Sequence, residues 1–124
     1  MKKKILVIDD DLSIRTLLLS FLSKTYDVTA KVDGMEAMVW LQDGNMPDLI
    51  VCDAEMPKMN GMEFVQNVKS SGFFKELPVI MLSSLDTSAE RIKYLKAGAN
   101  DFIVKPFNPE ELDVKIEIGL GRTF

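Results

Sequence analysis

Four short apolar runs each end in a polar or charged side chain, and this pattern strongly limits the possible folds. The runs cover residues 5–8, 49–52, 79–82 and 102–104, and they are followed by Asp9, Asp53, Ser83 and Lys105. Continuous apolar runs of this length are typical of strands that are covered on both faces of a parallel sheet. The carboxyl ends of parallel strands share one edge of an open sheet, where ligands bind. We therefore expect these polar side chains to converge at a single edge.

Segments with apolar residues at helical spacing separate these runs. Helices are expected over residues 12–23, 34–42, 60–70 and 87–97, and from Asn108 onward. Asn60 is a candidate N-cap, and Asn108-Pro109 followed by two acidic residues is a strong helix start. A shorter and more polar run at residues 28–32 suits an edge strand. The β/α alternation predicts an α/β, doubly wound fold with a five-stranded parallel sheet.

Length and composition exclude several classes of function. A chain of 124 residues predicts one domain, and its net charge of −4 disfavours direct nucleic-acid binding, which needs a basic face. The apolar run after the first lysines is too short for a signal peptide or a membrane span. The single cysteine, Cys52, suits a reducing compartment, so a cytoplasmic domain is expected. Because the sequence has no histidine, any phosphohistidine must belong to a partner.

The carboxylates at the strand ends predict a divalent-metal site. Asp9, Asp10 and Asp53 would repel one another unless a cation joins them, and Mg²⁺ prefers oxygen ligands and bridges to phosphate. Asp53 could attack a phosphoryl group as a nucleophile, with Lys105 holding a phosphate oxygen. The alternatives are a solvated aspartate turn that caps a helix and a surface lysine in a loop.

These motifs together resemble the receiver domain of bacterial two-component response regulators. The resemblance covers residues 3–120 and rests on five segments in order: residues 7–11 (VIDDD), 53–57 (DAEMP) with Asn60-Gly61, 81–84 (MLSS), 98–102 (GANDF) and 105–107 (KPF). It implies a flavodoxin-like (βα)5 fold with strand order 2-1-3-4-5. It also implies one receiver domain over residues 1–120, followed by a tail or the start of a linker over residues 121–124.

The resemblance implies a role for each matching residue. Asp53 matches the phosphoacceptor, and Mg²⁺ or Mn²⁺ would be held by Asp9, Asp10, Asp53 and the backbone carbonyl of Glu55. The remaining matches are phosphate binding by Ser83 and Lys105, switching by Ser83 and Phe102, and a cis peptide bond before Pro106. Two of these have simpler interpretations, because Ser83 could bond a neighbouring carbonyl and Phe102 could be a fixed core aromatic.

Two side chains near the site are predicted to set how long the phosphoryl group lasts. Glu55 places an extra carboxylate beside the site, where it could steer the attacking water or alter metal affinity. Leu85 is apolar at a position two residues past Ser83, where some relatives carry polar groups. We expect substitutions at these two positions to change the rate of dephosphorylation.

The implied function is a regulatory phosphorylation switch and not an enzyme acting on a separate substrate. A sensor histidine kinase or phosphotransfer protein would donate the phosphoryl group, and an output domain or protein would read a surface formed by the helix at 87–97, the strand at 102–104 and the final helix. A homodimer through that surface is a further expectation, although Glu117, Gly119 and Gly121 replace basic residues that relatives use there. The alternative is a receiver-like binding scaffold that acts without phosphorylation.

Two other classes fit the sequence less well. An aspartate-nucleophile phosphatase has a second aspartate two residues after the nucleophile, where this chain has Glu55. A dinucleotide-binding domain has a Gly-x-Gly-x-x-Gly motif after its first strand, and that motif is absent here.

Overall fold

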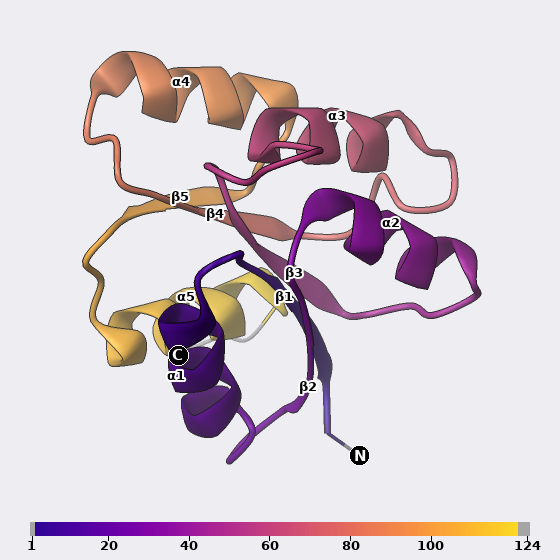
Figure 1. The fold of residues 1–124 in the computed structure, drawn as a ribbon, viewed down its shortest axis with the longest axis vertical. Coiled ribbons are helices and arrows are strands. Elements are labelled where there is room, and N and C mark those ends of the chain that lie inside the picture. Colours follow the sequence, from indigo (N-terminus) through magenta and orange to yellow (C-terminus); the bar gives the residue numbers. More distant parts are fainter. Residues whose placement is uncertain (1, 122–124) are drawn as a thin grey trace.

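The computed structural model describes residues 2–121 and contains alternating strands and helices (Figure 1). In chain order the elements are β1 (Lys4–Ile8), α1 (Leu12–Leu22), β2 (Asp27–Lys31), α2 (Gly34–Gln42), β3 (Leu49–Asp53), α3 (Gly61–Ser70), β4 (Val79–Ser83), α4 (Ser88–Ala97), β5 (Asp101–Val104) and α5 (Pro109–Gly119). The predicted α/β alternation is therefore confirmed.

The strands form one five-stranded parallel sheet in the order β2-β1-β3-β4-β5. This is the flavodoxin-like order expected from the resemblance. The order reverses between β1 and β3, so the carboxyl ends of these two strands flank the point where such sheets bind ligands. The polar residues that follow the central strands consequently share one edge of the sheet.

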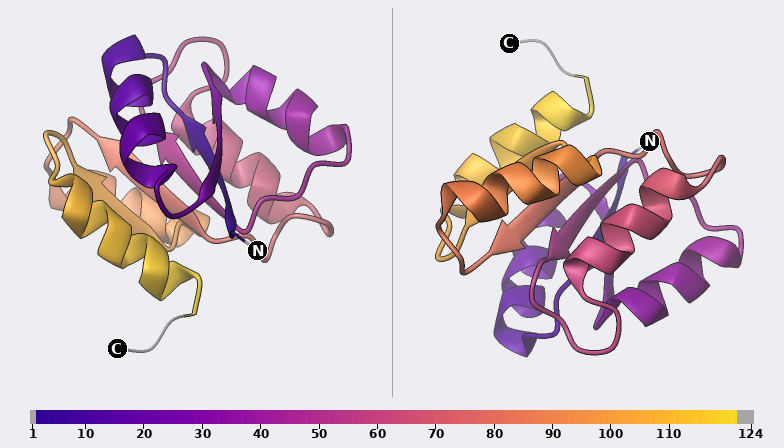
Figure 2. Two further views of the ribbon diagram at one scale, coloured as in Figure 1. Left: turned by 90° about the horizontal axis from the view of Figure 1, so that it is seen from below. Right: turned by 90° about the horizontal axis from the view of Figure 1, so that it is seen from above.

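Helices cover both faces of the sheet, as Figures 1 and 2 show. Helices α2, α3 and α4 pack on one face, where Phe64 is the largest fully buried side chain. Helices α1 and α5 pack on the other, through Leu18, Leu22, Leu112 and Ile116. Successive strand residues point to opposite faces, and both faces are covered, which explains why the apolar runs of the central strands are continuous and do not alternate with polar residues.

Local sequence signals start most helices where they were expected. Asn60 caps α3 in a reciprocal capping box: its side chain accepts from the N–H of Glu63, whose side chain accepts from the N–H of Asn60. Asn108 caps α5, and Pro109 occupies the first turn. Gly98 ends α4 in the left-handed conformation with φ of 114°.

Several element boundaries in the structure differ by one residue from those expected. Strand β2 covers Asp27–Lys31 and not 28–32, because its register is fixed by β1, with Lys4 opposite Asp27. Ser23 is the C-cap of α1, and Asn60 precedes α3 as its cap. Ser23 was expected inside α1, whereas Asn60, expected as a candidate N-cap at the start of the 60–70 segment, is confirmed in that role.

Helix α5 ends with a glycine, a residue that disfavours helices, and the contacts at this position explain its presence. Helix α5 runs through Gly119, where a Cβ would lie 2.7 Å from Cδ1 of Leu49. The glycine therefore lets the end of α5 approach β3 closely, at the cost of helix propensity. Of the predicted tail at 121–124, residues 122–124 lie outside the described part of the chain. Within residues 2–121, none of the helices has the length and apolar character needed to cross a bilayer.

Candidate functional site

Polar residues from three strand ends meet at the carboxyl edge of the sheet. Asp9 directly follows β1, while Asp53 and Ser83 are the last residues of β3 and β4. All three are buried, with at most 2% of their surface exposed. Lys105 directly follows β5, and its N–H donates to the carbonyl of Ser83. The convergence expected from the sequence is therefore present.

Three carboxyl groups at this edge of the sheet form a candidate metal site. Asp9, Asp10 and Asp53 each offer a carboxylate oxygen, and the three oxygens lie within 4.8 Å of one another. Asp9 and Asp53 are buried, while Asp10 is exposed and opens the cluster to solvent. A set of oxygen donors with one open side fits Mg²⁺ or Mn²⁺, which prefer oxygen ligands, and Mg²⁺ usually keeps several waters.

The ammonium of Lys105 bridges two of the carboxylates. Its Nζ lies 3.0 Å from Oδ1 of Asp53 and 3.2 Å from Oδ2 of Asp9. Burial disfavours the charged ammonium, but the hydrogen bond and charge of Asp53 outweigh burial and raise the pKa of Lys105. Lys105 is thus a positive charge fixed next to Asp53, and only 17% of its side chain is exposed, which argues against the alternative of a surface lysine in a loop.

The carboxyl group of Asp53 is in an unfavourable environment for a negative charge. Burial raises its pKa from 3.8 to about 7, and the charge of Asp9 adds to the rise. The hydrogen bond from Lys105 and the backbone N–H of Glu55 act in the opposite direction. Because burial dominates, a cation placed among the carboxylates would favour the ionised form of Asp53.

The loop between β1 and α1 is held by two contacts that fix Asp9. The N–H of Asp11 donates to Oδ1 of Asp9 at 2.9 Å, and the guanidinium of Arg15 donates to the carbonyl of Asp9 at 2.9 Å. Asp11 itself caps α1 by accepting from the N–H groups of Ser13 and Ile14. The capping alternative therefore describes Asp11, whereas Asp9 and Asp10 belong to the acidic cluster. Sequence reasoning missed Arg15, because a contact to a backbone carbonyl leaves no motif.

The side chain of Glu55 contacts two serines of the neighbouring loop. Its Oε2 accepts from the hydroxyl of Ser83 at 2.9 Å, and its Oε1 accepts from the N–H and hydroxyl of Ser84 at 3.0 and 2.7 Å. Burial works against the carboxylate, yet the bonds from Ser84 and Ser83 lower the pKa of Glu55. Sequence reasoning gave Ser84 no role, although it stands in the quoted MLSS segment.

The two predicted switch residues, Ser83 and Phe102, are buried and in contact with neighbouring side chains, whereas Leu85 is exposed. Ser83 donates to Glu55 and accepts from the N–H of Leu85 at 3.0 Å, so it does not bond a neighbouring carbonyl. Phe102 is 2% exposed and packs against Tyr94 of α4, with ring centroids 5.7 Å apart. The guanidinium of Arg91 lies 5.3 Å from the centroid of the Phe102 ring, and it donates to the backbone carbonyl of Phe102 at 3.2 Å. Leu85 is exposed.

The backbone around the site is tightly arranged. The Lys105–Pro106 peptide bond is cis. At the start of α3, a Cβ on Gly61 would lie 2.7 Å from Cα of Ala54 and 2.8 Å from the carbonyl oxygen of Asp53. This glycine is therefore what allows α3 to begin directly against the residue that carries the central carboxylate.

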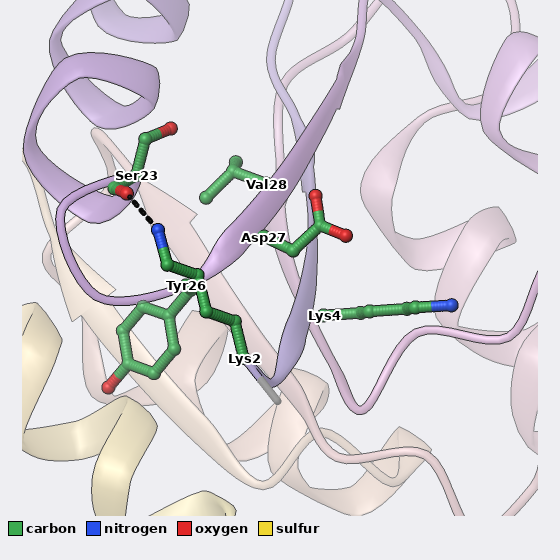
Figure 3. A pocket seen from close by; sticks show the side chains of 6 residues that line it. All are labelled: Lys2, Lys4, Ser23, Tyr26, Asp27 and Val28. Atoms are coloured by element: carbon green, nitrogen blue, oxygen red, sulfur yellow. Dashed lines mark hydrogen bonds between the residues drawn. The ribbon is translucent and has the colours of Figure 1, made fainter.

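A separate surface hollow lies at the opposite, amino-terminal edge of the sheet. Figure 3 shows that it is lined by Lys2 and Lys4 from the start of the chain together with Ser23, Tyr26, Asp27 and Val28. Two of the residues that line this hollow are joined by a hydrogen bond, in which the ammonium of Lys2 donates to the carbonyl of Ser23 at 3.1 Å. The acidic cluster and this hollow are thus at opposite ends of the strands.

Comparison with known proteins agrees with this geometry. A sequence model described as the response regulator receiver domain matches residues 5–117. The probable transcriptional regulator ycf27 of Cyanophora paradoxa is 43% identical over 98% of this chain and 50% of its own length. The chemotaxis protein CheY1 of Helicobacter pylori (strain 26695) is 40% identical over 95% of this chain and 97% of its own length. The chain thus spans about half the length of the ycf27 relative.

A solved structure shows the same arrangement of elements. It is the receiver domain of the sensor histidine kinase PA1611 from Pseudomonas aeruginosa PAO1, described with a magnesium ion coordinated in its active-site cleft. It is 26% identical, has a TM-score of 0.87, and the match covers 98% of this chain and all of that one.

Proposed function

The chain belongs to the response regulator receiver domain family, and from this premise we propose that it is a phosphorylation switch that accepts a phosphoryl group on Asp53. The observation that carries the proposal is the bridge from Lys105 to Asp53 and Asp9, beside a cluster of three carboxylates. The arrangement supports the proposal because a buried carboxylate, a positive charge and a candidate metal site lie together at one edge of the sheet.

The transfer step uses Asp53 as the nucleophile. A carboxylate oxygen of Asp53 forms a bond to phosphorus while the P–N bond of a partner's phosphohistidine breaks. The electron pair of the broken bond stays on the imidazole nitrogen, which leaves as a neutral ring once protonated. The product is an aspartyl phosphate, and no histidine of this chain is needed.

Lys105 and the groups that would hold a metal ion would assist this step. Lys105 would move from the Asp53 carboxylate to an oxygen of the phosphoryl group, which keeps the positive charge paired. Asp9, Asp10, Asp53 and the carbonyl of Glu55 would hold Mg²⁺ or Mn²⁺. When bound, that ion would neutralise charge on the attacking and transferred oxygens. The magnesium-bound PA1611 receiver domain supports this choice of metal.

Phosphorylation would act on the α4-β5-α5 surface through Ser83 and Phe102. To move a two-state equilibrium from 1:99 to 99:1, the phosphoryl group must favour the active state by about 5.5 kcal/mol. Charge-assisted hydrogen bonds are worth about 1.5–3 kcal/mol each. The bonds from Ser83 and Lys105 to the phosphoryl group would replace bonds that both side chains already make to carboxylates, so only the difference between the new and the old bonds counts toward this free energy. Phe102 is already buried against Tyr94, so its part in the switch would be a change in packing and not entry from solvent.

The proposed partners are a histidine kinase or phosphotransfer protein and an output domain or protein. The domain itself is regulatory, and its only chemistry would be its own phosphorylation and the hydrolysis of the aspartyl phosphate. Glu55 and Leu85 would set the rate of that hydrolysis. A homodimer through α4-β5-α5 would have to form around the Lys115–Asp101 and Lys93–Glu90 pairs, which each monomer already makes.

The direct test is the intact mass of the protein after incubation with acetyl phosphate and Mg²⁺. Wild type should gain one phosphoryl group, which peptide mass spectrometry should locate to Asp53. It should gain none when the metal is chelated before acetyl phosphate is added. Asp53→Asn should gain none, while Asp86→Asn, at an exposed position in the β4-α4 loop, should behave as wild type. Failure of wild type to react, together with failure to bind beryllofluoride, would favour the phosphorylation-independent scaffold.

A further inference from the structure

One carboxylate joins the loop after Asp53 to the loop after Ser83. Glu55 accepts three hydrogen bonds: one from the Ser83 hydroxyl at 2.9 Å and two from Ser84 at 3.0 and 2.7 Å. Hydrogen bonds to an ionised acceptor are among the stronger ones in proteins. The connection therefore holds the two loops together in the unphosphorylated protein.

The hydroxyl of Ser83 has one proton, and that proton is already used. A serine hydroxyl can donate once and accept with its lone pairs. In this structure it donates to Glu55 and accepts from the N–H of Leu85. The hydroxyl cannot donate to a phosphoryl oxygen on Asp53 while it donates to Glu55, so the two bonds exclude each other.

We propose that Glu55 is a latch: in the unphosphorylated state its carboxylate holds the Ser83 hydroxyl. The phosphoryl group must displace Glu55 from this hydroxyl before the hydroxyl can bond the phosphoryl group. The inference rests on the proposed function and adds to it a named competitor for the switch hydroxyl. Glu55 acts through Ser83, so it is a positioning residue.

Ser84 gives the latch its second point of attachment. Its N–H and its hydroxyl both donate to Oε1, while Ser83 donates to Oε2. When the Ser83 hydroxyl turns to the phosphoryl group, the two bonds from Ser84 keep the Glu55 carboxylate on the β4-α4 loop. The latch can therefore close again when the phosphoryl group is lost, and Ser84→Ala should weaken it without touching either Glu55 or Ser83.

The first measurement is the affinity for beryllofluoride in the presence of Mg²⁺, followed by the amide signals of the β4-α4 loop in NMR spectra. Glu55→Ala should bind about tenfold more tightly than wild type, which corresponds to about 1.4 kcal/mol. The affinities of Glu55→Gln, which keeps an acceptor but no charge, and of Ser84→Ala should lie between those of wild type and Glu55→Ala. Asp86→Asn removes one negative charge from the same loop and should stay within about twofold of wild type.

A double-mutant cycle separates the latch from simple charge repulsion. In a Ser83→Ala background the Glu55→Ala substitution should lose most of its effect, because the hydroxyl that the two groups compete for is gone. If the gain is as large without Ser83 as with it, Glu55 acts only through its charge and the latch is refuted. Equal affinity of wild type and Glu55→Ala would refute it as well.

The second measurement needs neither metal nor beryllofluoride. The Ser84 amide should be protected from hydrogen exchange in the metal-free wild-type protein, and Glu55→Ala should abolish that protection while Asp86→Asn keeps it. An unprotected Ser84 amide in wild type would refute the latch by itself. Failure of wild type to bind beryllofluoride would instead refute the proposed function, and with it the role of the latch, even where Ser84 is protected.

Discussion

Replacing Asp53 by asparagine should stabilise the metal-free protein. Burial raises the pKa of Asp53 from 3.8 to about 7, so the folded state holds a proton on this carboxyl group more tightly than the unfolded chain does. Stability that depends on this proton is complete below about pH 4 and is lost as the pH rises through 7, because the unfolded state releases the proton first. Asparagine has no proton to lose at this position.

The size of the effect follows from the shift in pKa. At 1.36 kcal/mol for each pH unit, a rise from 3.8 to about 7 corresponds to about 4 kcal/mol. The exposed Asp10 opens the cluster to solvent, which screens the charges, so about half of this, roughly 2 kcal/mol, is expected above pH 7. With a urea m-value of about 2 kcal/mol/M, the unfolding midpoint of Asp53→Asn should lie about 1 M above that of wild type.

The assay is urea unfolding with chelator present, followed by circular dichroism at pH 4.5 and pH 7.5. The gap between Asp53→Asn and wild type should widen from the lower to the higher pH. Mg²⁺ at ten times its dissociation constant should then add about 1.4 kcal/mol to wild type and less to the variant. A gap that is independent of pH, or a variant that is less stable than wild type at pH 7.5, would refute the reasoning.

Three further substitutions have defined outcomes. Lys105→Ala removes the positive charge beside Asp53, so Mg²⁺ should bind about tenfold more tightly in a calorimetric titration, and unchanged affinity would contradict the pairing. Gly61→Ala places a Cβ 2.7 Å from Cα of Ala54 and should lower the free energy of unfolding by about 1–3 kcal/mol in urea, where an unchanged midpoint would show that α3 can shift freely. Arg91→Ala removes the guanidinium 5.3 Å from the Phe102 ring, so NMR relaxation should show a more mobile ring, and equal mobility would mean that core packing, including that of Tyr94, fixes the ring without Arg91.

Features set by neighbouring residues could be predicted from the sequence. The apolar runs gave the strands, and the polar residue after each run gave the site, because the geometry of a parallel sheet brings strand ends together. The α3 capping box and the Pro109 start of α5 are equally local signals. For these elements the pattern and the fold agree to within one residue.

Features set by contacts between distant segments could not be predicted. The start of β2 depends on its register with β1, and Gly119 is explained only by its approach to Leu49. The direction of the Glu55 side chain depends on donors 28 and 29 residues away, so its position beside Asp53 suggested a role near the metal and not a bond to Ser83. Periodicity carries no information about such contacts.

The separation of the acidic cluster from the hollow of Figure 3 offers a practical site for a probe. The two lie at opposite ends of β1, and its five residues, at about 3.3 Å each, span the distance between them. A fluorophore or a surface tether attached at the exposed Asp27 would leave the carboxyl edge and the α4-β5-α5 surface open to solution. Immobilised in this orientation, the domain would present both its carboxyl edge and the α4-β5-α5 surface to an added protein, so binding at either place could be timed on a single molecule.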